Sequence, residues 1–162
     1  MSLQLCPITP EDQDVITVLL RKHWGSERVV SRGKLHDASR LPGFVALSEG
    51  ETFGLVTYRI EGRECELVTL DSWRENQGIG TALIEAIKRE ALKAGCTRLW
   101  LITTNDNLRA LGFYQKQGFH LVAVHPNAIA ESRKIKPEIP EIGLHGIPLR
   151  DEIELEMRLS AM

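Results

Sequence analysis

The clearest pattern of apolar and polar residues along the chain lies between residues 64 and 95. The stretch from Glu66 to Leu70 is apolar enough for a strand, and a polar turn follows it. Beyond the turn, apolar residues recur at helical spacing on one side of a long segment, at Ile84, Ile87, Ala91 and Leu92. Gly95 then provides a helix stop, so the sequence predicts a strand, a turn and an amphipathic helix.

Similar patterns predict the remaining elements. Strands are predicted over residues 3–8, 43–48, 52–60, 64–70, 98–103, 119–124 and 151–159. A first helix is predicted with Thr9 as its cap, Pro10 at the first helical position and Asp12 three residues after the cap. A shorter helix is predicted over residues 105–118, with Gly118 as its stop. This order of elements predicts an α+β domain with one mixed, mainly antiparallel sheet flanked by helices.

In two segments the apolar residues follow neither helical nor strand spacing. Residues 24–42 are polar and irregular, which favours a solvated connector with room for a short helix; a loop lining one side of a binding cleft is the alternative. Residues 125–150 form a long, Pro-rich connector before the last strand, and its apolar residues indicate that it packs. Its basic residues either meet an acidic acceptor or are incidental charges of a solvated loop: Arg133, Lys134, Lys136, His145 and Arg150.

Composition narrows the class of protein. The chain has 162 residues, 43% of them hydrophobic, which predicts a single globular domain over residues 1–162. The net charge of −2 predicts no general attraction to nucleic acid or membranes, and no apolar run reaches membrane-spanning length. No signal peptide is evident, and three widely spaced cysteines predict reduced thiols in a cytoplasmic protein. No metal site is expected, and a reactive thiol stays an open alternative.

The turn before the long helix carries two glycines, in the run Gln77-Gly78-Ile79-Gly80-Thr81. Backbone N–H groups at a helix start attract an anion, and glycine lets a phosphate come close. The run therefore favours a phosphate-binding turn, although a Gly-x-Gly pair can also simply turn the chain. A dinucleotide fingerprint fits badly because Leu83 stands in place of the third glycine. A P-loop fits badly because Thr81-Ala82 replaces its lysine and hydroxyl residue, so no lysine or metal is supplied locally.

A second motif follows about 30 residues later and consists of Asn107, Tyr114, Gly118 and Phe119. Together with the two glycines of the turn, and in this order, it resembles the paired motifs of the GNAT superfamily of acyl-CoA-dependent N-acetyltransferases. The resemblance covers about residues 3–124 and the last strand. It implies a six- or seven-stranded sheet flanked by about four helices. It also implies transfer of an acetyl group from acetyl-CoA to a primary amine, by direct attack in a ternary complex.

The resemblance implies a cofactor role for several residues. Backbone groups of the turn would hold the pyrophosphate of the cofactor: Gln77, Gly78, Ile79, Gly80 and Thr81. The pantetheine arm would lie along the preceding strand near Leu70. Glu75 departs from the Gln or Arg of the family, and the adjacent Arg74 could substitute for it. Asn107 would bind the pantetheine, cap its helix, or do both.

The resemblance also implies catalytic roles. Tyr114 would protonate the leaving thiolate, with core packing as the alternative. Glu64 and Glu66 share one face of their strand, so either could accept the proton of the ammonium. The alternatives are that they are solvated glutamates at a strand edge, or that the proton leaves through water.

Three classes of function are compatible with these motifs. The first is an acetyltransferase acting on an amine, with a small molecule as the preferred acceptor and the 125–150 connector setting its specificity. The second is a non-catalytic acyl-CoA sensor or interaction module, and the third a protein–protein module with vestigial motifs. Tyr114 and the intact glycines favour the enzyme, while Glu75 favours the vestigial case mildly. A homodimer is compatible with the sequence, and no nucleic-acid or membrane partner is expected.

Overall fold

The computed structural model of the protein describes residues 3–74 and 78–160. The chain divides into two compact units, which we describe one at a time. Unit 1 comprises Met1–Val29, Asp37–Leu99 and Leu159–Met162, and unit 2 comprises Val30–His36 and Trp100–Arg158.

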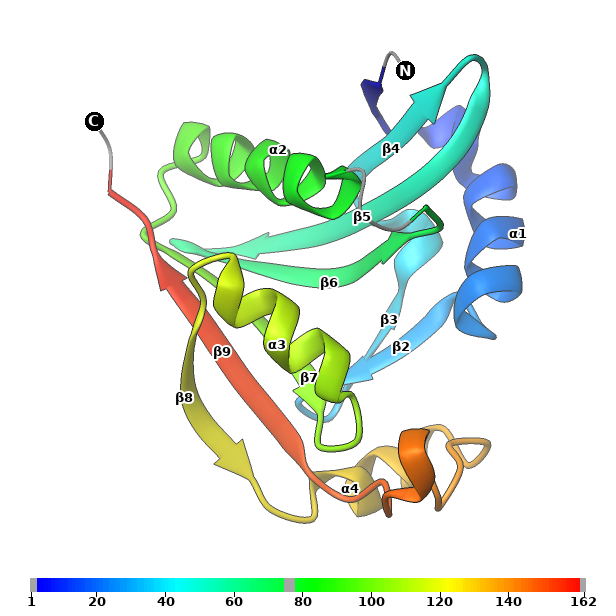
Figure 1. Cartoon of the computed structure of the whole chain (residues 1–162), viewed down its shortest axis with the longest axis vertical. Helices are drawn as coiled ribbons and strands as arrows, with labels where there is room; N and C mark the ends of the chain where they lie inside the picture. Colours follow the sequence, from blue (N-terminus) through cyan, green and yellow to red (C-terminus); the bar gives the residue numbers. More distant parts are fainter. Residues whose placement is uncertain (1–2, 75–77, 161–162) are drawn as a thin grey trace. The chain divides into compact units, whose positions relative to one another are not determined.

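The elements follow the predicted order closely (Figure 1). The α-helices are α1 (Gln13–Trp24), α2 (Ile79–Lys93), α3 (Leu108–Lys116) and α4 (Ala128–Ile135). The strands are β1 (Gln4–Pro7), β2 (Arg28–Ser31), β3 (Lys34–Asp37), β4 (Gly43–Ser48), β5 (Glu51–Glu61), β6 (Glu64–Ser72), β7 (Arg98–Thr104), β8 (His120–His125) and β9 (Glu152–Arg158). Short 3-10 turns are η1 (Pro10–Asp12), η2 (Ala38–Arg40) and η3 (Leu144–Gly146).

The strands form a seven-stranded sheet and a separate hairpin. The hydrogen-bonded order of the sheet is β1-β4-β5-β6-β7-β9-β8, and β2 pairs with β3. The pairs β1–β4, β4–β5, β5–β6 and β8–β9 are antiparallel. The predicted α+β class, with a mainly antiparallel sheet and four α-helices among the described residues, is therefore confirmed.

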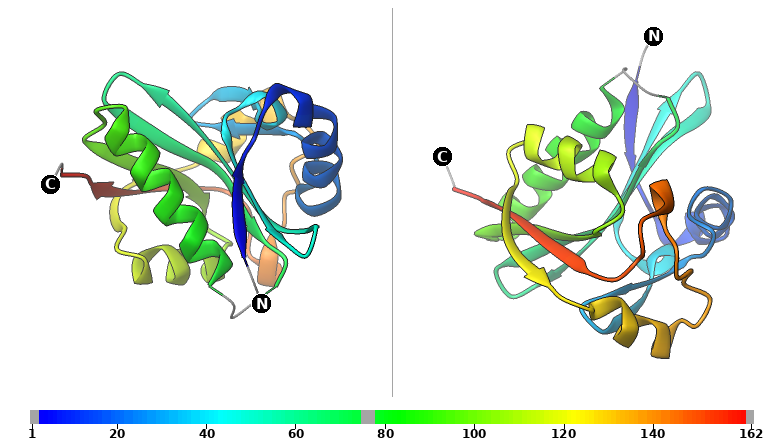
Figure 2. Two further views of the ribbon diagram at one scale, coloured as in Figure 1. Left: turned by 90° about the horizontal axis from the view of Figure 1, so that it is seen from above. Right: turned by 60° about the horizontal axis from the view of Figure 1, so that its bottom comes forward.

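In unit 1, helix α2 packs on strand β5 through a glycine. A Cβ atom on Gly54 would lie 2.7 Å from Cγ2 of Ile79 and 3.1 Å from Cδ1 of Leu83. Only a hydrogen fits between strand and helix at this point, and both apolar side chains are fully buried. Figure 2 shows, on its left, α2 lying along one face of the strands of this unit.

The predicted cap precedes helix α1, because Thr9 and Asp12 form a capping box. The carboxylate of Asp12 accepts hydrogen bonds from the backbone N–H of Thr9 at 2.9 Å and from its hydroxyl at 3.0 Å. Pro10 opens the 3-10 turn η1, which continues into α1. The apolar side of α1 then buries Ile16 and Leu20.

Residues 24–42 are more ordered than a plain connector. They contain the β2–β3 hairpin and the 3-10 turn η2. The two residues between the strands, Arg32 and Gly33, have φ angles of 49° and 75°. Positive φ at both positions is the geometry of a tight hairpin turn, whose twist matches that of the strands. The Arg-Gly pair was therefore a turn signal inside an otherwise polar segment.

In unit 2, the Pro-rich connector contains a helix that the sequence did not predict. Helix α4 lies within residues 125–150, and the right-hand view of Figure 2 shows the chain leaving β8, forming α4 and returning to β9. Strand β9 buries Ile153 and Leu155 as its alternation predicts. Its opposite face is not simply solvated, because Glu152 is only 2% exposed and pairs with Arg32 at 3.2 Å.

Within residues 3–74 and 78–160, no helix combines the length and the apolar composition needed to cross a membrane. The same residues contain no group of three or more His, Cys, Asp and Glu side chains arranged to hold a metal ion.

The close approach of β4 and β5 yields a test of the fold. A Cβ on Gly43 would lie 1.9 Å from the carbonyl oxygen of Val56, which is backbone and cannot move aside. We expect Gly43→Ala to lower the free energy of unfolding by about 3 kcal/mol, the upper end of usual overpacking costs. Gly112→Ala is the matched control: it lies inside helix α3, its Cβ would meet nothing within 4 Å, and it should stabilise by about 0.5–1 kcal/mol. Urea unfolding of both variants measures the difference, and equal stabilities would contradict the described packing.

Candidate active site

Strand β6 leads into the glycine turn as a firmly paired strand. Its pairing with β5 runs from Glu64 opposite Glu61 to Ser72 opposite Gly54. Inside this pair, the hydroxyls of Thr57 and Thr69 lie 2.6 Å apart and share a buried hydrogen bond. The strand end that includes the predicted pantetheine residue Leu70, which is half-buried, is therefore held by backbone pairing on its β5 side.

Helix α2 starts from a left-handed glycine. Gly78 is its N-terminal cap, with φ 71° and ψ 13°, a conformation that glycine adopts without strain. A Cβ at Gly78 would meet nothing within 4 Å, so the glycine serves the backbone conformation here and not close packing. Ile79 is buried, Gly80 is half-buried and Thr81 is exposed. Gln77 and Glu75 lie outside the described residues.

The start of α2 is suited to an anion. Its first turn, residues 79–81, carries no acidic side chain, whereas α1 has Asp14 in its first turn and α4 has Glu131. Acidic residues near a helix N-terminus offset the positive end of the helix dipole. Without them in the turn, the backbone N–H groups of α2 keep their attraction for a negative ligand.

The residues between β6 and the glycine turn are held by aromatic contacts. The guanidinium carbon of Arg74 lies 3.8 Å from the ring centre of Phe53. The ring of Trp73 stacks on His23 with 4.0 Å between centres, and its backbone N–H donates to the carbonyl of Phe53 at 2.8 Å. Arg74 is thus an exposed cation whose position is fixed by an aromatic ring.

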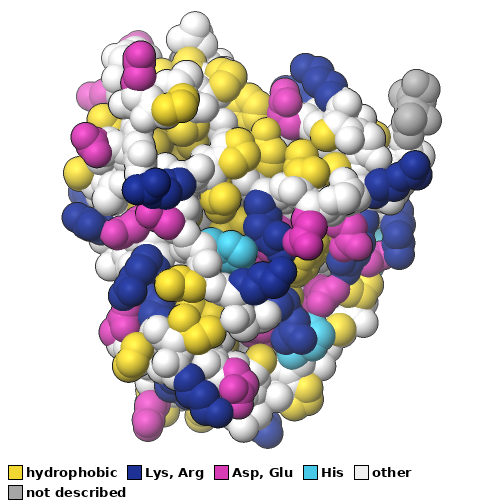
Figure 3. All heavy atoms as spheres, turned by 180° about the vertical axis from the view of Figure 1, so that it is seen from behind, with side chains coloured by type: hydrophobic (Ala, Val, Ile, Leu, Met, Phe, Trp, Pro, Cys, Tyr) yellow, Lys and Arg dark blue, Asp and Glu magenta, His cyan; other side chains and the backbone are white. Residues whose placement is uncertain are grey.

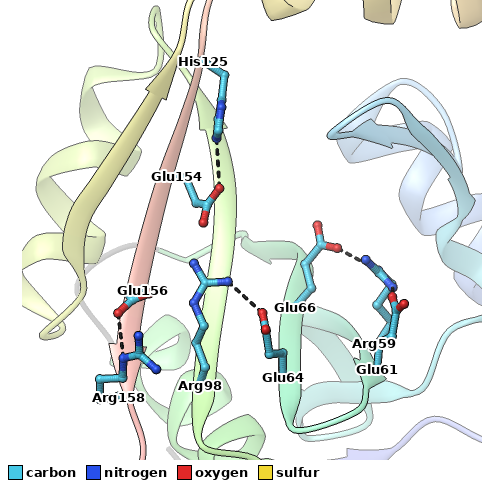
Figure 4. Close-up of polar contacts among 9 residues, drawn as sticks. All are labelled: Arg59, Glu61, Glu64, Glu66, Arg98, His125, Glu154, Glu156 and Arg158. Carbon is cyan, nitrogen blue, oxygen red and sulfur yellow. Dashed lines mark hydrogen bonds and ion pairs between the residues drawn. The ribbon is translucent and has the colours of Figure 1, made fainter.

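The candidate bases on β6 are both ion-paired (Figure 4). Glu66 is 2% exposed, and its Oε1 accepts a hydrogen bond from Nε of Arg59 at 2.8 Å. Glu64 is 51% exposed and accepts from Nη1 of Arg98 at 2.9 Å. The alternative of a solvated edge glutamate fits the exposure of Glu64 and does not fit the burial of Glu66.

In unit 2, the second motif lies on helix α3. The side-chain oxygen of Asn107 accepts the backbone N–H of Ala110 at 3.2 Å, so Asn107 caps the helix, as one of its alternatives predicts. Tyr114 is 9% exposed and lies edge-on to Phe113 and Phe119, with ring centres 5.4 and 5.6 Å away. The packing alternative for its ring is therefore realised, and this packing also fixes the direction of its phenol group.

The buried cysteines are poor nucleophiles. Burial raises the pKa of the Cys65 thiol to about 12, and it also raises the pKa of Cys96. A thiol with a pKa near 12 is ionised in roughly one molecule in 100,000 at pH 7. The thiolate is the reactive form, so neither residue is suited to carry an acyl group.

Several polar groups of unit 2 were not singled out from the sequence. Nε2 of His125 on β8 lies 2.9 Å from Oε1 of Glu154 on β9. Asn105 and Asp106 bind the backbone of the 125–150 connector. Their partners are 29 to 46 residues away in the chain, so no local period revealed them. On the face shown in Figure 3, basic and acidic side chains are interspersed.

The glycine-capped helix that follows a strand, and the Asn-capped helix that carries a tyrosine, are the two motifs that resemble those of GNAT acetyltransferases. The model of the acetyltransferase (GNAT) family matches residues 9–119, and the chain belongs to this family. The uncharacterized protein YdhI of Bacillus subtilis (strain 168) is 46% identical over 140 residues, covering 86% of this chain and 88% of YdhI.

Solved structures show the same fold. An IAA acetyltransferase from Bacillus cereus ATCC 14579 superposes with a TM-score of 0.70 and 21% identity, covering 98% of this chain and 100% of the other. An acetyltransferase from Bacillus subtilis in complex with CoA superposes with a TM-score of 0.66 and 18% identity, covering 98% of each chain. At these identities the likeness concerns the fold alone.

Proposed function

We propose that the protein transfers the acetyl group of acetyl-CoA to the primary amine of a small molecule, by direct attack in a ternary complex. The observation that carries the proposal is the start of helix α2, where a left-handed glycine cap opens a first turn without acidic residues. Membership of the GNAT acetyltransferase family supports the reaction class, and a protein of like fold binds CoA.

The pyrophosphate of the cofactor would bind the N–H groups of Gly78, Ile79, Gly80 and Thr81, with Gln77 as a further candidate. These groups need no side chain and attract a doubly charged ligand through the helix dipole. Arg74 adds a cation just before the turn, adjacent to Glu75, which stands where the family has Gln or Arg. The pantetheine would follow the backbone of β6 near Leu70, and Asn107 would contribute from the start of α3.

The amine nitrogen bonds to the thioester carbonyl carbon, the carbon–sulfur bond breaks, and its electron pair leaves on sulfur. The nitrogen loses two protons, one from the ammonium to a base before attack and one after the nitrogen–carbon bond has formed. Tyr114 would give its proton to the thiolate, and the second nitrogen proton would restore the Tyr114 hydroxyl. The high pKa of Cys65 supports direct transfer over an acyl-enzyme intermediate.

For the base we favour Glu66 over Glu64. Glu66 is buried, where its carboxylate is shielded from bulk water, while Glu64 is exposed. Its Oε1 lies 2.8 Å from Nε of Arg59, which fixes the direction of the carboxylate on β6. Proton loss through water remains the competing route.

The acceptor and the location of the enzyme are also part of the proposal. The net charge of −2 provides no general attraction for a long charged polymer, which supports a small amine as the acceptor. The cysteines of the described chain are free thiols, which supports a reducing compartment such as the cytoplasm.

The reaction is tested by release of CoA thiol from acetyl-CoA with a panel of four amines: hydroxylamine, tyramine, spermidine and kanamycin A. We expect amine-dependent turnover with at least one of them. Tyr114→Phe keeps the ring and removes the hydroxyl, so kcat should fall roughly 100-fold while the Kd of CoA stays unchanged. If the protein binds CoA but turns over none of the amines, it is a non-catalytic sensor and not an enzyme. If Tyr114→Phe keeps full turnover, Tyr114 has no role as a proton donor.

The cofactor site is tested by Gly80→Val. The added side chain would occupy the space that a phosphate must enter at the first turn of α2, and we expect the Kd of CoA to rise at least 10-fold. Ala94→Val is the matched control, because it places the same side chain at the exposed opposite end of the same helix. Calorimetric titration measures the Kd of CoA for both variants. Equal affinity of the two folded variants would mean that the pyrophosphate does not bind at this turn.

The base is tested by Glu66→Gln beside Glu64→Gln. If Glu66 accepts the ammonium proton, its amide variant should lose roughly 100-fold in kcat/KM. Glu64→Gln, two residues away on the same strand, should change kcat/KM less than about threefold. Similar kcat/KM values for both variants and the parent protein would mean that the ammonium proton leaves through water and that Glu66 is not the base.

A further inference from the structure

The turn between β7 and α3 is tied to the distant 125–150 connector. Within unit 2, the side chain of Asn105 donates to the carbonyl of Pro148 at 2.9 Å. Its side-chain oxygen accepts the backbone N–H groups of Arg150 at 3.0 Å and Asp151 at 2.9 Å. The backbone N–H of Asn105 donates to the carbonyl of Asp151 at 3.1 Å. One residue thus fixes the end of the connector to the segment that precedes helix α3.

Asp106, the next residue, makes a second hydrogen-bonded contact with the connector. It is 5% exposed, and its carboxylate accepts the hydroxyl of Thr104 and, at 2.8 Å, the backbone N–H of Leu144. A Cβ on Gly143 would lie 2.1 Å from Oδ2 of Asp106. Because φ of Gly143 is −97°, the glycine is needed for this close approach and not for a left-handed turn.

The part of the connector that Asp106 holds has an ordered structure of its own. Ile142 bridges Pro148, and the backbone N–H groups of Gly143 and Leu149 donate to the carbonyls of Ile147 and Glu141, both at 2.8 Å. A left-handed pair at the tip, His145 and Gly146, with φ of 59° and 71°, reverses the chain. This segment is therefore a small hairpin.

Arg133, on helix α4, stabilises the same hairpin through hydrogen bonds. Its Nη2 donates to the carbonyl oxygens of Pro140 and Leu149, both at 2.8 Å, and its Nε donates to that of Ile139 at 3.3 Å. Arg133 therefore has a structural role, which differs from the acceptor contact considered from the sequence. The braced hairpin gives Asp106 a rigid partner instead of a loose loop.

Helix α3 is consequently held at both ends. At its C-terminal end, Tyr114 packs edge-on against the buried Phe119. At its N-terminal end, Asn107 caps the helix and the neighbouring Asp106 ties it to the hairpin. Two fixed ends determine the direction of a nine-residue helix and thus the position of the Tyr114 hydroxyl. A misplacement of about 1 Å at a reacting group can cost roughly 100-fold in rate.

We propose that Asp106 is a positioning residue for Tyr114, acting through its hydrogen bond to the hairpin at Leu144. The inference rests on the proposed function, because it assumes that Tyr114 protonates the leaving thiolate. Asp106 supplies neither a proton nor a contact with the cofactor. Its effect belongs to kcat and not to the binding of acetyl-CoA.

The test is a double-mutant cycle of Asp106→Ala and Tyr114→Phe in the full chain, assayed with acetyl-CoA and the fastest of the four panel amines. We expect Asp106→Ala to lower kcat roughly 10-fold with the KM of acetyl-CoA changed less than twofold. In the Tyr114→Phe background the same change should lower kcat less than twofold, because the hydroxyl that it positions is already gone. An equal loss in both backgrounds would overturn the proposal.

Gly143→Ala approaches the same contact from the other side. Its Cβ would collide with the Asp106 carboxylate, so kcat should fall roughly 10-fold in the parent protein and not fall further in the Asp106→Ala background. Asp106→Asn, which keeps the shape and one acceptor oxygen, should lose less than Asp106→Ala and serves if the alanine variant does not fold. Glu141→Gln, an exposed residue of the same hairpin, is the control and should keep full kcat.

The outcomes separate the two proposals. If the parent protein acetylates none of the four amines, the proposed function fails and the positioning role falls with it. If the parent protein is active and both Asp106→Ala and Gly143→Ala keep full kcat, the positioning role alone is wrong. A change confined to thermal stability, with kcat retained, would likewise assign Asp106 to folding.

Discussion

Helix α2 can begin where it does because Gly54 on strand β5 has no side chain. A Cβ on Gly54 would lie only 2.7 Å from Cγ2 of Ile79, too close for two carbon atoms. This contact fixes the first residue of the helix against the sheet, directly after the left-handed Gly78. The backbone N–H groups of that first turn are then rigid, and a rigid set of donors needs no rearrangement when it meets an anion. The cofactor proposal depends on this packing more than on any polar side chain.

Much of this architecture can be predicted from local sequence patterns. The turn at Glu49 and Gly50, with φ of 51° and 80°, lies between two strands that were both predicted to within a residue or two. Helix α2 was predictable because its apolar stripe is long and Gly95 ends it. Asn107 and Tyr114 were found through the spacing of a family motif, since one asparagine and one tyrosine on a helix carry little information alone.

The features that the sequence did not reveal depend on distant partners or on weak local signals. The β2–β3 hairpin has strands of four residues each, too short for an alternation to stand out. Helix α4 is only eight residues long and starts after Asn127, whose φ of 59° is uncommon outside glycine. The burial of Glu152 follows from Arg32, 120 residues away, and the need for glycine at position 143 follows from Asp106. No window along the chain contains both members of either pair.

The high pKa of the two buried thiols favours a mechanism that depends on alignment of the reactants and not on a reactive cysteine. With Cys65 buried and its pKa near 12, the described chain has in this residue no nucleophile to hold the acetyl group. Direct transfer then requires the amine, the thioester and a proton donor to be aligned at the same moment, and such alignment supplies much of the rate. A proton donor on a short helix is only as well aligned as the ends of that helix. The hydrogen bonds of Asn105 and Asp106 to the connector, and those of Arg133 inside it, all fix one of these ends. The long Pro-rich connector, which looks like an insertion, therefore supports helix α3, the helix that carries the proposed proton donor.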